Sequence, residues 1–372
     1  MLRKSVSAFR DVIYDKSIAA TVLDFELFQS VAPSTFENIR KLFSGQQGKQ
    51  PGMGINVMYE HFHKHGYQTL FQEDLCWYDT SGTLLTDITT AKDAIPTEQR
   101  WSKFKNTTSK LHIDHFGLTH FSCEVFKQFG KTNPYEDPQK MCFNGRFFSS
   151  YFLRYMKDFA NATRTARNAA PFISYMHIST AHTGNGRRCR NVDVELTDFI
   201  SKMARDNLTW TIIMSDHGHR RTPFTFSTLQ GEYERYNPLL FMIIPEQVAQ
   251  ILGKEAMNAL HGNQKRLLTT VDLHRAFTSI NDEDKRHSTD SKVSGVLSKI
   301  PWSRSCADVP LSSSVKCLCA ASEEKSEDNS PKHQWMAEFA LGTLNNEIQS
   351  QYSNGKKTIL LGLPTLLQHR KN

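Results

Sequence analysis

The run Thr209-Trp-Thr-Ile-Ile-Met214 leads directly into Ser215-Asp-His-Gly218. A largely apolar run of this length is typical of a strand covered on both faces, as in a parallel sheet with helices on each side. Leu239-Leu-Phe-Met-Ile-Ile244, which stops at Pro245, repeats the pattern. The chain is therefore expected to fold around a buried sheet.

Segments with a strand pattern alternate with segments with a helix pattern. Strands are expected at 19–23, 67–71 and 171–178, and helices at 53–64, 146–167 and 192–205. Long helices between buried strands favour an α/β fold with a mostly parallel sheet. The polar segment SEEKSEDNSPKH interrupts this pattern and predicts a linker at 322–333. It would join a core at 1–321 to a small C-terminal unit at 334–372, with a helix near 334–351 and a strand at 358–362.

The composition excludes several classes of protein. Of the 372 residues, 39% are hydrophobic and 22% are charged, as in folded chains and unlike disordered or collagenous ones. No window reaches the ~18 to 20 continuous apolar residues of a membrane-spanning helix, so no transmembrane segment is predicted. The formal net charge of +7 is small for this length, so it permits an anionic substrate without indicating nucleic-acid binding.

The sequence features that bear on the cellular compartment of the protein do not decide between compartments. The first residues contain no apolar stretch of the kind found in secretory signal peptides. The seven cysteines are dispersed and odd in number. Sequons at Asn106, Asn161 and Asn207 make the chain a candidate glycoprotein.

Asp216 and His217 are the first candidates for a metal site. They follow a buried strand, and ligands of open α/β sheets bind beyond the carboxyl ends of the strands. A carboxylate oxygen and an imidazole nitrogen suit zinc or manganese, and Gly218 lets the chain turn so that both side chains face one ion. The alternative is that Asp216 caps the next helix beside an exposed His217.

Two further segments carry candidate catalytic residues. In PSTFENIRKLFSG, Thr35 stands at the start of an expected helix, where the dipole and free N–H groups favour an alkoxide and an anionic phosphate. The alternative there is a capping box made by Ser34 and Glu37. His182 follows an expected strand in HISTAH. The alternative is that His177 points into the core and His182 has no role.

The segments TFENIRKLFSG, HISTAH and IIMSDHG, in this order, resemble the alkaline-phosphatase and sulfatase-like superfamily. More narrowly, the chain resembles the animal sulfatase-like family catalogued as domain of unknown function 229. The stretches that carry this resemblance span nearly the whole chain: FHKHGYQTLFQED, KMCFNGRFFSSYFLRYMKDF, DNLTWTIIMSDHGHR, GEYERYNPLLFMIIPE, RLLTTVDLHRAF and RSCADVPLSSSVKCLC.

The resemblance implies an alkaline-phosphatase-like core and a metal-dependent phosphoester hydrolase. TFEN is similar to the T-F-P-N segment of the superfamily's phosphodiesterase branch, so Thr35 is implied as nucleophile and metal ligand. Asp216 and His217 are implied to bind the same ion, Zn²⁺ or Mn²⁺, and His182 to face the substrate or a second metal.

The resemblance also bears on the substrate and the compartment. Sulfatases use a formylglycine made from Cys or Ser, so Thr35 implies phosphate rather than sulfate esters. Arg220 and Arg221 are expected to neutralise the phosphoryl group, the alternative being a solvated basic turn. The family implies an extracellular or secretory-pathway lumenal protein, with structural disulfides among Cys306, Cys317 and Cys319.

Two departures from the family pattern keep a second function open. The superfamily's first strand, which ends in a metal-binding aspartate, falls before Met1, so a single and incomplete metal site is expected. Glu37 stands where the phosphodiesterases have proline, and it would repel an anionic substrate unless it faces away. The alternatives are an inactive family member that binds an anionic ligand or a protein partner, and a chain truncated at its N-terminus.

Overall fold

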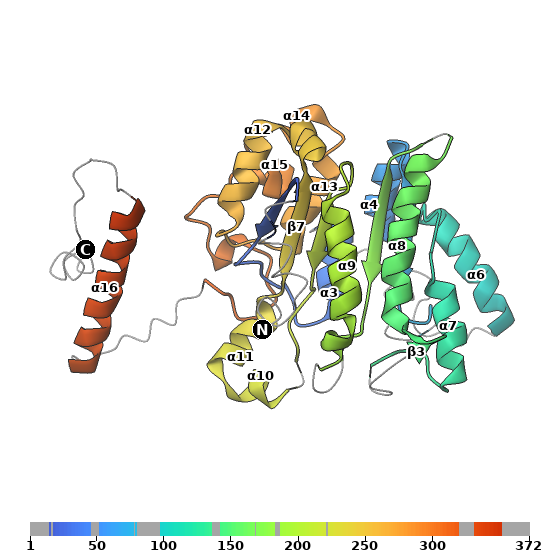
Figure 1. The fold of residues 1–372 in the computed structure, drawn as a ribbon, viewed down its shortest axis with the longest axis horizontal. Coiled ribbons are helices and arrows are strands. Elements are labelled where there is room, and N and C mark those ends of the chain that lie inside the picture. Colours follow the sequence, from blue (N-terminus) through green and yellow to red (C-terminus); the bar gives the residue numbers. More distant parts are fainter. Residues whose placement is uncertain are drawn as a thin grey trace. The chain divides into compact units, whose positions relative to one another are not determined.

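The computed structural model describes residues 15, 18–45, 52–77, 79, 97–135, 142–167, 169–182, 187–220, 222–319 and 331–351. Contacts within the chain divide it into two compact units, Met1–Ala320 and Ala321–Asn372. Figure 1 gives the order of the helices and strands along the chain.

The first unit is built on two main strand ladders. In the first, β7 (Leu240–Pro245) lies between β1 (Ala20–Asp24) and β6 (Thr211–Met214) and runs antiparallel to both. In the second, β2 (Gln68–Glu73) pairs in parallel with β5 (Phe172–His177). A short hairpin joins β3 (Cys142–Phe143) to β4 (Arg146–Phe147).

The predicted α/β class is confirmed, with a more mixed pairing than the sequence indicated. Parallel pairing is found between β2 and β5, whereas β7 is antiparallel to its two neighbours. Because β1 and β6 both oppose β7, they run in the same direction as each other.

Helices cover both faces of β7. Leu240, Met242 and Ile244 enter one hydrophobic cluster, whereas Phe241 and Ile243 enter another, which is the two-residue period of a fully buried strand. The first cluster includes side chains of α3 (Thr35–Ser44), α4 (Ile55–Lys64), α12 (Glu246–Asn263) and α13 (Thr270–Ser279). The second includes side chains of α8 (Phe148–Thr165) and α9 (Asp193–Ala204).

The remaining helices include α6 (Thr97–Lys110) and α7 (Thr119–Gln128), which lie beside α4 and α8 in Figure 1, and the short pair α10 (Pro223–Ser227) and α11 (Leu229–Tyr236). Smaller helical segments are η1 (Arg187–Val192), α14 (Glu283–Arg286), α15 (Ser291–Ser294), η2 (Gly295–Leu297) and η3 (Cys306–Asp308). In the described part of the chain, no helix combines the length and apolar character that crossing a membrane requires.

The described part of the second unit is one helix, α16 (Pro331–Gln351). It covers the helix predicted near 334–351. The strand predicted at 358–362 and most of the linker predicted at 322–333 lie outside the described residues. The division into core, linker and terminal unit therefore stays a prediction.

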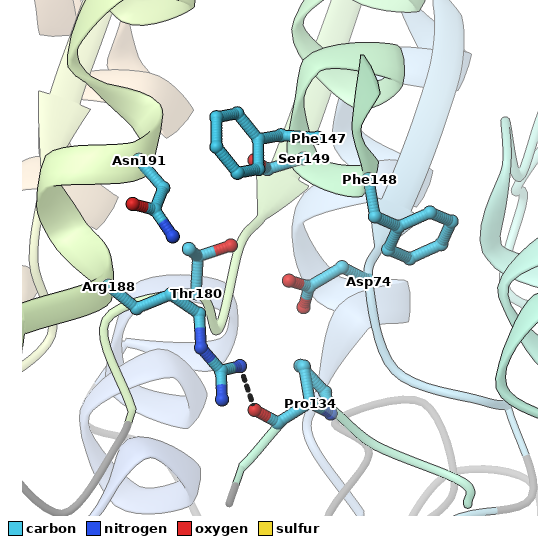
Figure 2. A pocket seen from close by; sticks show the side chains of 8 residues that line it. All are labelled: Asp74, Pro134, Phe147, Phe148, Ser149, Thr180, Arg188 and Asn191. Carbon is cyan, nitrogen blue, oxygen red and sulfur yellow. Dashed lines mark hydrogen bonds between the residues drawn. The ribbon is translucent and has the colours of Figure 1, made fainter. Parts of the chain in front are cut away.

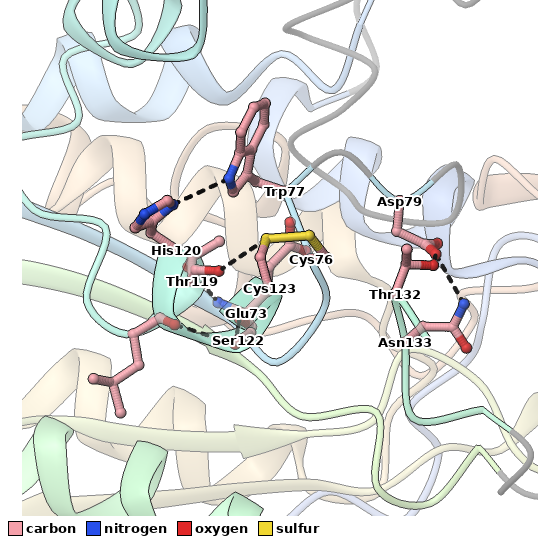
Figure 3. The surroundings of a disulfide bond; sticks show 11 residues. Glu73, Cys76, Trp77, Asp79, Thr119, His120, Ser122, Cys123, Thr132 and Asn133 are labelled. Atoms are coloured by element: carbon pink, nitrogen blue, oxygen red, sulfur yellow. Dashed lines mark hydrogen bonds between the residues drawn. A yellow bond between two sulfur atoms is a disulfide. The ribbon is translucent and has the colours of Figure 1, made fainter. Parts of the chain in front are cut away.

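Two disulfides are present among the described residues. Cys76–Cys123 joins the segment after β2 to α7, beside Glu73 and Trp77 (Figure 3). Cys306–Cys317 closes a loop near the end of the first unit, while Cys142, Cys189 and Cys319 are free thiols. Stable disulfides are typical of extracellular and secretory-pathway proteins.

Candidate functional site

Thr35, Asp216 and His217 meet at one point of the first unit. Thr35 is the first residue of α3, and Asp216 and His217 follow β6 directly. Thr35 Oγ1 lies 3.4 Å from His217 Nε2, although 182 positions separate the two residues. Asp216 Oδ2 lies 3.4 Å from the same nitrogen. The structure thus brings together the three residues that the sequence singled out as metal ligands.

The imidazole of His217 is oriented by its own backbone. His217 Nδ1 lies 2.7 Å from the Gly218 carbonyl oxygen, which can only accept a hydrogen bond, so Nδ1 carries the proton. In the neutral imidazole, Nε2 then has a lone pair that faces Thr35 Oγ1 and Asp216 Oδ2. Asp216 Oδ2 is buried and has no hydrogen-bond partner among the residues that the structure describes. His217 Nε2 therefore accepts a hydrogen bond from the Thr35 hydroxyl, whereas Asp216 Oδ2 faces the same nitrogen without a hydrogen bond.

The N-terminus of α3 is open on the side of Thr35. Ser34 is the N-cap residue, but its side chain makes no capping hydrogen bond. Its hydroxyl instead donates to Glu37 Oε2 at 2.9 Å, and Glu37 is exposed. The expected capping box is therefore incomplete, because the Ser34 side chain does not cap the first N–H groups of the helix. The Glu37 carboxylate accepts a hydrogen bond from Ser34 and is exposed to solvent, which weakens its repulsion of an anionic substrate.

The loop before α3 fixes the position of Thr35 relative to Asp216. The hydroxyl of Ser30 donates to the Asp216 carbonyl oxygen at 2.9 Å. Asn38, which is fully buried, accepts from the backbone N–H of Val31 and donates to the carbonyl oxygens of Ala32 and Ser34. A single amide side chain thereby holds the turn that leads into the helix.

Gly218 is required by packing rather than by a left-handed backbone. Its N–H donates to the Arg235 carbonyl oxygen at 2.9 Å. A Cβ at this position would lie 2.0 Å from the Glu234 carbonyl oxygen, so α11 approaches the chain too closely for a side chain. The sequence correctly indicated a glycine-dependent turn, but the close approach of α11 could not be inferred from local residues.

The segment that contains the Cys306–Cys317 disulfide contacts the loop before α3. Gln29 receives the N–H of Leu318 at 2.8 Å and donates to the Lys316 carbonyl oxygen at 3.2 Å. The segment next to Cys317 is thereby attached to the residue before Ser30, which contacts Asp216.

Replacing both Cys306 and Cys317 by serine is expected to lower the free energy of unfolding by about 3 kcal/mol, the loop-closure value for a disulfide that spans 11 positions. Urea unfolding measures this loss. Cys319→Ser is the matched control, because Cys319 is an exposed free thiol two residues away, and it should change the stability by less than about 0.5 kcal/mol. Equal stabilities of the double variant and the control would contradict the expectation.

The other predicted site residues are His182, Arg220 and Arg221. His182 lies in the turn after β5, where its ring packs against Tyr135 with 4.3 Å between centroids. None of the hydrogen bonds and ion pairs described for Thr35, Asp216 or His217 reaches it. Arg220 is half-buried two residues after Gly218, and Arg221 lies outside the described residues.

A small cavity lies at the end of β2, next to the turn after β5 (Figure 2). Asp74, Thr180 and the buried Arg188 are among its lining residues, and Arg188 donates to the Pro134 carbonyl oxygen. Both oxygens of Asp74 accept from the Ser179 N–H at 2.8 Å. Arg188 is thus part of the interior.

Burial raises the pKa of Asp74 from 3.8 to about 7, although the hydrogen bond from Ser179 acts in the opposite direction. Between pH of about 4 and about 7, the folded chain holds this proton while the unfolded chain has lost it. The free energy of unfolding should therefore fall as the pH rises through this window, by about 4 kcal/mol. In Asp74→Asn this fall should be absent, because the amide does not titrate. Urea unfolding from pH 4 to 8 measures both slopes, and parallel curves for the two proteins would contradict the assignment.

The described residues do not contain three or more His, Cys, Asp or Glu side chains grouped closely enough to hold a metal ion. The site described here contributes one carboxylate, one imidazole and one hydroxyl. His177, at the end of β5, was not singled out as a site residue by the sequence, and burial lowers its pKa.

Solved structures with a distant likeness to the chain include three bacterial proteins. The C-terminal periplasmic domain of EcEptC from Escherichia coli shares 11% identity, with 75% of each chain covered and a TM-score of 0.42. The soluble domain of lipooligosaccharide phosphoethanolamine transferase A from Neisseria meningitidis shares 11%, over 75% of this chain and 83% of that chain, with a TM-score of 0.45. The lipoteichoic acid synthase LtaP from Listeria monocytogenes shares 10%, over 60% and 57%, with a TM-score of 0.34.

No curated protein matches the sequence significantly. The family model described as "Protein of unknown function (DUF229)" matches residues 101–358, which is more than half of the chain. The family resemblance predicted from the sequence is therefore confirmed, and the chain belongs to the DUF229 family.

Proposed function

We propose that this protein is a metal-dependent phosphoester hydrolase in which the Thr35 hydroxyl is the nucleophile. The observation that carries the proposal is that Thr35 Oγ1 and Asp216 Oδ2 each lie 3.4 Å from His217 Nε2. The order of the sequence segments, which resembles that of the alkaline-phosphatase and sulfatase-like superfamily, supports the same reaction class.

The three side chains fit a zinc or manganese ion. In a tetrahedral site with bonds of ~2.05 Å, neighbouring donor atoms lie ~3.3 Å apart, which agrees with both distances to His217 Nε2. A cation would also provide the missing partner of Asp216 Oδ2. Two oxygens and one nitrogen make three protein ligands, the number found in many catalytic zinc sites. When bound, the ion supplies Lewis-acid stabilisation of negative charge on the phosphoryl oxygens and on the attacking oxygen.

The protein's own groups then account for the reaction. The uncapped N-terminus of α3 offers N–H groups and its dipole to an anion beside Thr35. The Thr35 oxygen attacks phosphorus, so that a bond from Oγ1 to phosphorus forms while the bond from phosphorus to the ester oxygen breaks, and the ester group leaves as an alcohol with the proton that Thr35 has lost. Water then attacks phosphorus, the bond from Oγ1 to phosphorus breaks, a proton from that water returns to Oγ1, and the phosphate leaves. Arg220, with Arg221 next to it in sequence, provides positive charge for the phosphoryl oxygens.

The compartment that fits this function is extracellular or the lumen of the secretory pathway. Two disulfides among the described residues support it. All three sequon asparagines are exposed, at Asn106, Asn161 and Asn207, which is the condition for glycosylation.

Hydrolysis of bis(p-nitrophenyl) phosphate in the presence of ZnCl₂ or MnCl₂ tests the proposal. Turnover should require the metal, stop on addition of EDTA and return when the metal is restored. p-Nitrophenyl sulfate is the matched substrate and should not be cleaved, because threonine cannot form the aldehyde that sulfatases use. Absence of phosphoester cleavage with either metal, in a protein that binds the metal, would favour a non-catalytic binding protein.

A further inference from the structure

The C-terminal end of α4 carries two histidines that the proposed reaction does not use. His61 and His65 are four positions apart, so their side chains lie one above the other on the same face of the helix. Their ring centroids are 4.6 Å apart, with 46° between the ring planes. Imidazole nitrogens are common ligands of transition metals, so this pair can hold an ion if one lone pair of each ring is free.

The imidazole of His65 is oriented by the backbone of the same helix. Its Nδ1 lies 2.7 Å from the His61 carbonyl oxygen, which can only accept a hydrogen bond, so Nδ1 carries the proton. In the neutral ring, Nε2 then keeps a lone pair, and the side chain is exposed. Metal-binding histidines almost always donate their other ring N–H in this way, which fixes the tautomer and the orientation of the ring. The same hydrogen bond caps α4, but capping uses Nδ1 alone and leaves Nε2 available.

His61 contributes a nitrogen that is buried and unpaired. Its Nε2 has no hydrogen-bond partner in the described part of the chain. The ring packs edge-on against Phe62, with 5.4 Å between centroids, and beside His65. A buried polar atom without a partner is unfavourable, and the capping hydrogen bond of His65 does not relieve it. A cation bound between the two rings would give this nitrogen a partner.

The spacing of the rings distinguishes between metal geometries. With ~2.0 Å from the metal to each nitrogen and ~1.2 Å from the nitrogen to the ring centre, two imidazoles at a right angle have centroids ~4.5 Å apart, whereas a tetrahedral angle gives ~5.2 Å. The observed 4.6 Å agrees with the right angle. Right angles between neighbouring ligands are typical of Cu²⁺ and Ni²⁺, which favour square-planar and tetragonal sites.

We propose that His61 and His65 form a second metal site, which binds Cu²⁺ or Ni²⁺ through Nε2 of both rings. The described residues contain no group of three or more His, Cys, Asp or Glu side chains that could hold an ion, so water occupies the other coordination positions. The site shares no residue with Thr35, Asp216 and His217, and the inference therefore does not depend on the proposed function.

The test titrates Ni²⁺ calorimetrically into the full chain, because Ni²⁺, unlike Cu²⁺, does not oxidise the exposed thiols of Cys142 and Cys319. His61→Gln and His65→Asn should each lower the Ni²⁺ affinity about 10-fold or more, since the loss of an outer-sphere partner alone costs about 10- to 100-fold. His287→Asn is the matched control, because His287 is also an exposed histidine at a helix C-cap, and it should change the affinity less than about twofold.

Chemical modification of the parent locates the bound ion without any variant. Diethyl pyrocarbonate modifies free imidazole nitrogens, so Ni²⁺ should protect the exposed His65 and leave His287 reactive. Protection of His63 and His112, whose rings stack at 4.7 Å, in place of His65 would overturn the inference. If a variant is unfolded by circular dichroism, this measurement decides.

Two further outcomes separate this site from the candidate site at Thr35. Asp216→Asn should keep the Ni²⁺ binding that His61→Gln removes, and its loss in Asp216→Asn would place the ion at the candidate site and overturn the inference. Equal Ni²⁺ affinities in the parent, His61→Gln and His65→Asn would also overturn it. A protein that binds Ni²⁺ through His61 and His65 but cleaves no phosphoester would contradict the proposed function and leave this inference standing.

Discussion

Replacing Thr35 by alanine is expected to lower kcat/KM for phosphodiester hydrolysis by about 1,000-fold or more, because it removes the attacking oxygen. The fold should be unaffected. Thr35 is partly exposed, and the hydrogen bond seen for its side chain among the described residues is the 3.4 Å approach to His217 Nε2. Steady-state kinetics with bis(p-nitrophenyl) phosphate measures the loss, and thermal unfolding verifies that the variant is folded.

Two neighbouring variants make this test specific. Thr35→Ser keeps a hydroxyl at the same position and should retain most of the activity. Ser34→Ala removes the adjacent hydroxyl, which donates to Glu37 and not to the site, so its kcat/KM should stay within about twofold of the parent value. Hydrolysis by Thr35→Ala at the parent rate would exclude Thr35 as the nucleophile and leave a metal-bound or water-based attack.

Local sequence patterns predicted the elements that carry the site. The apolar run before Asp216 is β6, Leu239–Ile244 corresponds to β7, and the helix expected at 146–167 is α8. These predictions succeeded because a strand buried on both faces and an amphipathic helix each have a recognisable spacing of apolar residues in the sequence. Helix α6 has a mostly polar sequence with two adjacent threonines at 107–108, so its periodicity gave too weak a signal to be recognised.

Contacts between distant segments could not be predicted in this way. That Thr35 lies close to the segment of Asp216 and His217 was an expectation from the family resemblance. The hydrogen bond that the Glu37 carboxylate accepts from Ser34, and hence its position at the surface, could not be predicted from the sequence. The Cys76–Cys123 disulfide joins cysteines 47 positions apart, for which seven dispersed cysteines allow many pairings. His177 was weighed as a core residue, and the structure places it at the end of β5 with a partly exposed side chain.

Asp216→Asn is expected to have opposite effects on stability in the absence and presence of zinc. Without metal, the variant should be at least as stable as the parent, because it replaces a buried carboxylate oxygen that has no hydrogen-bond partner by a neutral group of the same shape. With zinc, the parent should gain about 2.7 kcal/mol at a free zinc concentration 100 times its Kd, whereas the variant should gain little. Zinc affinity should fall more than about 100-fold, beyond the loss that outer-sphere partners cause.

Asp206→Asn separates this effect from the general cost of removing an aspartate. Asp206 is also buried, but it has partners, since it forms an ion pair with Arg164 and accepts the N–H of Leu208. Its variant should therefore lose stability equally with and without zinc, so that the zinc-induced gain stays as in the parent. The two thermal unfolding series, each with and without ZnCl₂, distinguish a metal ligand from a structural carboxylate. If Asp216→Asn behaves like Asp206→Asn, the acid after β6 is structural, and the cation must be held elsewhere.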